Sequence, residues 1–253
     1  MFGFPKGSAW LQPVRAIVFL LAAWELFSWA IAPNWPSAIE VGRIVWSDVR
    51  EPAFQAALGG SVSRMVVGYL LVMTIGIPGG ILLGRFPLVD QLMGSAAVAL
   101  HAIPGAAWVP LAILWFGMTE QAVIFTIVLG AAGIVIVSTD TGIREVPPLI
   151  ARAARTMGAH GVRYFWFVVV PAAIPKIVDG LRLAWAFGWR ALMAGELLTS
   201  VSGLGQQLNR VAKAGEVDQL LAIMLLIAVI GIAVDGLLFK RLEHAVRVRW
   251  GLT

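Results

Sequence analysis

Five charged side chains lie inside long apolar stretches of the sequence, where a charge is costly and therefore indicates a function or a specific partner. They are Glu25, Arg182, Arg190, Glu196 and Asp235. Arg190 and Glu196 are six residues apart, too far round one helix for a direct pair, so each should find its partner on another helix or on a second copy of the chain. We expect Arg190 to add a positive field to a path through the apolar layer. The alternative for Arg190 is an interhelical ion pair or a position close to the interface.

The other intramembrane charges predict local support. Arg182 lies three residues after Asp179, a spacing that allows the two to pair on one helix. Glu25 and Asp235 fall in the first and last apolar stretches, where we expect packing or assembly roles.

No spacing in the sequence supports covalent catalysis or nucleotide hydrolysis. The chain has no cysteine, which excludes thiolate chemistry and disulfides, and its three histidines are scattered, at positions 101, 160 and 244. The Gly-rich phosphate loop that ends in Gly-Lys-Ser/Thr, the His-Glu-x-x-His zinc motif and the nucleophile elbow are absent. We therefore expect no enzyme, no metal site and no cofactor bound by this chain.

The composition indicates the class of protein that holds these side chains. Of 253 residues, 59% are hydrophobic and 13% are charged, with a mean hydropathy of +0.86, whereas a soluble domain carries about 25% charged residues. These values predict an integral membrane protein whose apolar side chains face lipid or each other. The net charge of +5 is then a sign of membrane topology rather than of a nucleic-acid partner.

Apolar stretches of about 17 to 25 residues predict transmembrane helices. The sequence holds six of them in one all-α domain over residues 1–253, with both termini on the same side. They are residues 16–32, 62–84, 91–116, 121–139, 177–198 and 218–239. Twelve basic residues fall on the faces that include the termini and residues 140–176, against five on the opposite faces. The positive-inside rule therefore predicts that both termini and residues 140–176 are cytoplasmic.

The sequence also predicts one helix outside the spans and a set of candidate path residues within them. The outer segment 33–61 contains AIEVGRIVW, which predicts an amphipathic helix at the membrane interface. Span two is rich in glycine, and span three is interrupted by Pro104, Gly105 and Pro110; both features suit either close helix packing or a path lined by freed carbonyls. His101 is expected to be an interior hydrogen-bond donor, with a role in the path as the alternative. The candidate path residues are His101, Pro104, Trp108, Trp189, Arg190 and Glu196.

Residues 145–176 predict two short helices on the cytoplasmic side. Pro147 and Pro148 suit a helix start, and Leu149, Ala153 and Met157 then share one stripe. Gly158 stands where a helix ends in a left-handed residue. A second helical segment is expected from about Val162 until Pro171 stops it.

This segment resembles the cytoplasmic loop of the permease subunits of bacterial ATP-binding-cassette (ABC) importers. The loop's motif is E-A-A, three residues, G, nine residues, I-x-L-P. Here Ala153 and Ala154 are the two alanines, Gly158 is the glycine, and Val168, x, Val170, Pro171 complete the spacing, while Arg152 replaces the glutamate. The resemblance implies that the loop docks on a separate ATPase subunit. The residues assigned to this coupling are Leu149, Arg152, Ala153, Ala154, Arg155, Met157, Gly158, Val168, Val170 and Pro171.

The resemblance extends over most of the chain. PSAIEVGRIVW, SVSRMVVGY, GIPGGILLGR, WVPLAILWFG and GLRLAWAFGWRALMAGELL are similar to the nitrate, sulfonate, taurine and bicarbonate branch of these permeases. The resemblance implies a type I (MetI-like) importer fold in a bacterial plasma membrane. It also implies a small, often anionic solute, a second permease copy, two ATPase subunits that use ATP and Mg, and an extracytoplasmic solute-binding protein.

Two other classes stay open at this point. A secondary transporter driven by an ion gradient would need coupling-ion groups near the midplane and usually internal repeats, and no convincing repeat is visible. An intramembrane enzyme would need a catalytic constellation that the sequence lacks.

Overall fold

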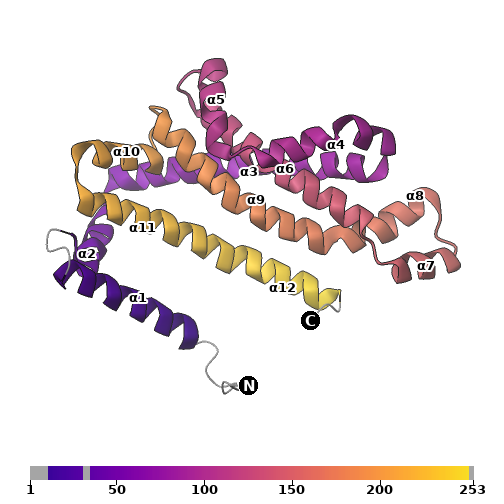
Figure 1. The fold of residues 1–253 in the computed structure, drawn as a ribbon, viewed down its shortest axis with the longest axis horizontal. Helices are drawn as coiled ribbons and strands as arrows, with labels where there is room; N and C mark the ends of the chain where they lie inside the picture. The colour runs from indigo at the N-terminus through magenta and orange to yellow at the C-terminus, as the bar shows by residue number, and fades with distance from the viewer. Residues whose placement is uncertain (1–10, 31–34, 251–253) are drawn as a thin grey trace.

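The computed structural model describes residues 11–30 and 35–250, which are helical almost throughout, with no strand in either range. The helices are α1 Leu11–Ala30, α2 Ala38–Asp48, α3 Pro52–Arg85, α4 Pro87–Ala102, η1 Gly105–Trp108, α5 Val109–Phe116, α6 Glu120–Arg144, α7 Pro148–Thr156, α8 Gly161–Tyr164, η2 Phe165–Val169, α9 Val170–Leu198, α10 Leu204–Ala214, α11 Val217–Val234, η3 Asp235–Phe239 and α12 Lys240–Arg249. Figure 1 shows α2 and α10 at one end of the bundle, and α7 and α8 at the other. The prediction of an all-α protein is confirmed.

The centre of the bundle is formed by α3, α6 and α9. Helix α3 approaches α6 through glycines, because a Cβ added at Gly68 would lie 2.8 Å from Ile127 Cγ2 and one added at Gly76 would lie 2.6 Å from Val135 Cβ. Small residues allow this close approach between helices. Of the two interpretations of the glycines in span two, the structure therefore favours helix packing.

Three helices are long and apolar enough to cross a membrane, among the described residues: Pro52–Arg85, Glu120–Arg144 and the continuous Val217–Arg249. Helices α4 and α5 would make a fourth span if their broken pair is counted as one. Helix α9 has 29 residues, or about 43 Å of helix, but it carries several charges. The arrangement with six spans remains a prediction.

One expectation about the helices is confirmed and one was wrong. Span three is interrupted at Pro104 as expected, because α4 and the η1–α5 segment are bent by 104° at the break, where Ile103 is extended and Pro104 precedes η1. Pro171 does not stop the second helical segment. The segment instead passes through a π-turn over Phe165–Val169 and continues as α9. A π-turn is a common way of accommodating a residue that cannot join the α-helical hydrogen-bond ladder.

Helix α2 is held against the end of α1 by three hydrogen bonds. The Ala38 amide donates to Glu25 Oε2 at 2.9 Å, Trp24 Nε1 donates to the Pro36 carbonyl at 3.1 Å, and Ser28 Oγ donates to the Trp35 carbonyl at 2.5 Å. A carboxylate at a helix N-terminus accepts from an unused amide and complements the helix dipole. Glu25 therefore fixes the turn between α1 and α2.

Candidate functional site

Helix α7 presents the motif at the end of the bundle farthest from α10 (Figure 1). Ala154 is 3% exposed and packs inward, while Leu149 and Met157 are 73% and 81% exposed. Gly158 has φ +82°, its amide donates to Arg155 O at 3.0 Å, and the Ala159 amide donates to Ala154 O at 3.0 Å. This is a Schellman ending, which requires the left-handed residue expected at Gly158.

The arginines around the motif point to solvent. Arg152 donates weakly to the Pro148 carbonyl at 3.3 Å, and the Arg155 guanidinium lies 5.7 Å from the centre of the Tyr164 ring. Arg152, Arg155 and Arg163 are all exposed. These charges and the exposed apolar side chains form a surface that the chain does not use for its own packing.

The second part of the motif lies at the root of α9 rather than on that surface. Val168, Val170 and Pro171 are half-buried. The Pro171 carbonyl accepts a hydrogen bond from Trp250 Nε1 at 3.0 Å. The motif is therefore divided between an exposed helix and the buried turn that joins it to the spanning helix α9.

Three of the six candidate path residues lie around the break in span three. His101, Pro104 and Trp108 belong to the bend, which packs against α9 where a Cβ added at Gly105 would lie 3.0 Å from Ala191 Cβ. Arg190, the neighbour of Ala191, is exposed and makes no ion pair within the described ranges. The buried Trp108 Nε1 has no hydrogen-bond partner there either. His101 is exposed in the single chain, and its role as an interior donor stays a prediction.

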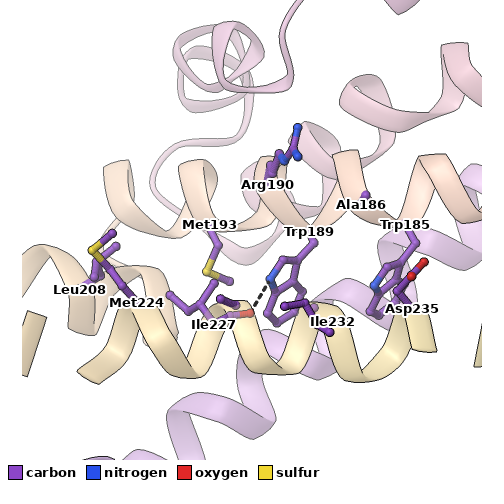
Figure 2. A pocket seen from close by; sticks show the side chains of 12 residues that line it. Trp185, Ala186, Trp189, Arg190, Met193, Leu208, Met224, Ile227, Ile232 and Asp235 are labelled. Carbon is purple, nitrogen blue, oxygen red and sulfur yellow. Dashed lines mark hydrogen bonds between the residues drawn. The ribbon is translucent and has the colours of Figure 1, made fainter. Parts of the chain in front are cut away.

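The other three candidates lie elsewhere on α9. Trp189 points toward α11 and donates to the Ile227 carbonyl at 3.3 Å, whereas Arg190 points away from α11 (Figure 2). Trp189 stacks on Trp185 in a groove of about 600 Å³ between α9 and α11. Glu196 is completely buried at the outer end of α9. Trp189 and Arg190 therefore line one groove from opposite directions, and Glu196 lies outside it.

The partners of the buried charges are residues that the sequence analysis did not select. Glu196 pairs with Arg64 of α3 and accepts a hydrogen bond from Ser61, which confirms that its partner lies on another helix. Arg64 was expected only as one of the five basic residues on the faces opposite the termini. The signal that it missed was an arginine in the apolar run VSRMVVGY, since an arginine so placed calls for a buried acid.

Arg182 also finds partners other than the expected one. Its Nε donates to Asp235 Oδ1 at 2.6 Å and its Nη1 donates to Glu243 Oε2 at 2.7 Å, while Asp179 is exposed. The π-turn that begins at Asp235 adds a residue to the helical turn and rotates the side chains that follow it. Arg182 therefore joins α9 to the α11–α12 helix.

Comparison with known proteins places this arrangement in a family. Residues 76–248 match the family described as the binding-protein-dependent transport system inner membrane component. The chain belongs to this family. The permease is 34% identical over 233 residues to a putative ABC transporter permease protein of Methanocaldococcus jannaschii, covering 88% of this chain and 85% of the relative. It is 32% identical over 178 residues to the taurine transport system permease protein TauC of Escherichia coli, covering 70% of this chain and 65% of the relative.

The fold of the permease agrees with that of a solved ABC transporter. An inward-facing structure of the MetNI methionine ABC transporter superposes with a TM-score of 0.66 at 19% sequence identity, covering 77% of the permease and 96% of that chain. The expected type I importer fold is thereby confirmed. As an ABC importer permease, the chain is an integral membrane protein and a transport subunit without an ATPase site of its own.

Proposed function

We propose that this permease moves a small oxyanion inward by alternating access, driven by two separate ATPase subunits and supplied by an extracytoplasmic binding protein. The observation that carries the proposal is the surface of α7. Its Leu149 and Met157 side chains are 73% and 81% exposed, on a helix held to the bundle by the buried Ala154. Exposed apolar side chains of this size, rimmed by arginines, are typical of a docking surface.

The link from α7 to the path is continuous backbone. From Gly161 the chain runs through α8 and the π-turn directly into α9, which packs against the bend in span three at Ala191 and carries Arg190 as the preceding residue. A force applied to α7 would therefore act on the root of the helix that lines the proposed path. The hydrogen bond from Trp250 to Pro171 would carry the same movement to α12.

An anionic solute is supported by the positive charge of Arg190 on α9. Arg190 has no acidic partner in the described part of the chain, and Trp108 offers an unused indole donor beside the same stretch of α9. An arginine without an acid in a spanning helix favours a negative ligand. Taurine, named for one relative, carries a sulfonate, and the sequence resemblance adds nitrate, sulfonates and bicarbonate as further candidates.

A second copy of the permease would complete the path. One face of α9 is uncovered along its length, with Lys176, Asp179, Leu183, Ala186 and Arg190 all exposed. A charged stripe on a spanning helix must face protein or water rather than lipid. We therefore propose a homodimer in a bacterial plasma membrane, with α7 and both termini in the cytoplasm. The permease would bind no cofactor, and its partner ATPases would use ATP and Mg.

The test is uptake by the assembled complex in proteoliposomes, with ATP hydrolysis measured in parallel. Gly158→Asp should uncouple the two, so that hydrolysis persists and uptake falls at least tenfold. Gly215→Asp is the matched control, because Gly215 also has a positive φ, of +74°, and open space at its Cβ, but it lies at the end of α10. Full uptake by Gly158→Asp would contradict the coupling role. Uptake that continues without the ATPase and stops when the proton gradient is collapsed would favour a secondary transporter.

A further inference from the structure

A polar groove lies at the end of the bundle opposite α7, where α9 ends and α10 begins. Its volume is about 350 Å³, and its lining includes Thr199 from the end of α9 and Gln206, Asn209, Arg210 and Lys213 from α10. Every lining side chain is polar or basic, and none is a carboxylate. The groove is therefore a different environment from the apolar gap between α9 and α11.

The positive charges of this groove are not neutralised by close ion pairs. Arg210 and Lys213 are three residues apart on α10 and so lie on one face of it. Neither makes an ion pair with a described residue. Arg210 also lines a smaller neighbouring pocket beside Asp48 and Glu51, and Lys213 does not. The groove consequently has a net positive charge.

The hydrogen-bonding groups of the groove also favour an anion, because its acceptors are occupied and one of its donors is not. Two carbonyls at the end of α9 would repel an anion, but both already accept hydrogen bonds. Leu197 O accepts from Asn209 Nδ2 at 2.9 Å, and Ser200 O accepts from Gln206 Nε2 at 3.3 Å. Thr199 is 4% exposed, and its buried Oγ1 has no hydrogen-bond partner in the described chain. A buried hydroxyl without a partner is rare, and it indicates a missing acceptor.

We propose that this groove is a binding site for a small oxyanion at the outer mouth of the permease. Thr199 Oγ1 donates a hydrogen bond to one oxygen of the anion, and Arg210 and Lys213 balance its charge. The identification of this anion with the imported solute rests on the proposed function. The volume suits nitrate or a short sulfonate with a few waters.

The test measures the binding of sodium nitrate and of taurine to the purified permease in nanodiscs, by calorimetry in a gluconate buffer, with no binding protein or ATPase present. Thr199→Val keeps the shape of the side chain and removes its hydroxyl. Lys213→Gln removes an exposed charge, so it should fold normally. Each change should weaken binding of at least one probe about tenfold, the loss expected for one hydrogen bond or charge contact to an ion. Thr74→Val and Arg43→Gln, which alter side chains outside the groove, should leave binding unchanged.

Several results would overturn the inference. Unchanged binding of both probes in Thr199→Val and Lys213→Gln would do so, and wild-type import of either solute would then leave the proposed function intact. A second measurement, in which the solute-binding protein is added to the same nanodiscs, gives the other contradicting result. The inference would fall if the variants weakened only the docking of that protein, since its acidic side chains would then be the occupants of the groove. If the variants lose anion binding but the wild-type complex shows no ATP-dependent uptake, the site is supported and the proposed function is wrong.

Discussion

The Arg64 guanidinium of α3 donates a hydrogen bond from Nη1 to Glu196 Oε1 of α9, and both residues are almost completely buried, at 4% and 0% exposure. The carboxylate also accepts from Ser61 Oγ at 2.8 Å and from the Gly205 amide at 2.9 Å. Ser61 Oγ in turn accepts from the Leu204 amide at 2.9 Å. One buried ion pair thus provides the N-terminal cap of α10 and fastens the outer ends of α3, α9 and α10 together.

Removing the charge of Glu196 should be strongly destabilising. In Glu196→Gln the buried Arg64 charge loses its buried counter-ion and keeps only the more distant, exposed Glu120, and breaking a buried pair costs about 3–5 kcal/mol. The expected result is a marked fall in the thermal unfolding midpoint of the purified permease. Glu120→Gln is the matched control, because Glu120 lies 3.5 Å from Arg64 but is 65% exposed, so its loss should cost less than about 1 kcal/mol. Equal effects of the two changes would contradict the role of the buried pair.

Two glycines of α3 should respond in opposite directions to alanine. Gly76→Ala places a Cβ 2.6 Å from Val135 Cβ, and such overpacking should cost about 1–3 kcal/mol. Gly59→Ala meets nothing within 4 Å, so the better helix former should stabilise the protein by about 0.5–1 kcal/mol. Thermal unfolding midpoints of the two variants and the wild type, measured in the same detergent, show whether each change in stability has the expected sign. A stabilising Gly76→Ala would mean that α3 and α6 lie farther apart than described.

Substitutions of two arginines of α9 should have different effects, one on stability and the other on transport. Arg182→Gln loses hydrogen bonds to Asp235 and Glu243 and should lower stability by about 1–2 kcal/mol, since the group is a third exposed. Arg190→Gln loses no ion pair, so its unfolding midpoint should stay within a degree or two of the wild type. Under the proposed function its uptake should fall about tenfold. An Arg190→Gln variant with wild-type uptake rate and apparent affinity would remove Arg190 from the path.

The contribution of Asp48, which lies near Glu51 and Arg210, to the free energy of unfolding should become more favourable as the pH falls. Burial raises the pKa of Asp48, the neighbouring Glu51 raises it further, and Arg210 opposes both. An acid whose pKa is higher in the folded state is costly to ionise there. The stability that protonation provides is therefore fully present below the unfolded pKa of 3.8 and is lost as the pH rises through the folded pKa. Asp48→Asn should raise the unfolding midpoint at pH 7 by a small amount, less than about 1 kcal/mol. Its advantage over the wild type should shrink toward pH 4, and an advantage that grows toward pH 4 would contradict this sign.

Features that depend on neighbouring residues were predictable from the sequence. Pro148 at a helix start, Gly158 in the left-handed region and the helix between them follow from backbone preferences that act over a few residues. The all-α membrane class follows from composition in the same way. The spacing from Ala153 to Pro171 was also sufficient to indicate the family, because a motif is a property of the chain alone.

Features that depend on residues far apart in the sequence were not predictable from it. The partner of Arg182 was expected at Asp179, which is nearby in sequence, but the chain places Asp235 and Glu243 closer through a π-turn. Pro171 was expected to end a helix, but the π-turn before it lets the helix continue. The interruption of span three was expected but its 104° angle was not, because the proline and glycine indicate a break without its angle.

The sequence by itself determined that this protein is a helical membrane subunit, which end carries most of its basic residues, and which short helix bears the family motif. Local backbone preference and hydropathy act along the chain, so they can be assessed without coordinates. Only the tertiary structure decided that Arg64 pairs with Glu196 across 132 positions and that Trp189 and Arg190 face opposite ways. It also decided that the Thr199 hydroxyl, which has no hydrogen-bond partner in the described chain, lies in one groove with Arg210 and Lys213. Burial and ion pairing depend on which surfaces three packed helices bring together, and no spacing within one helix contains that information.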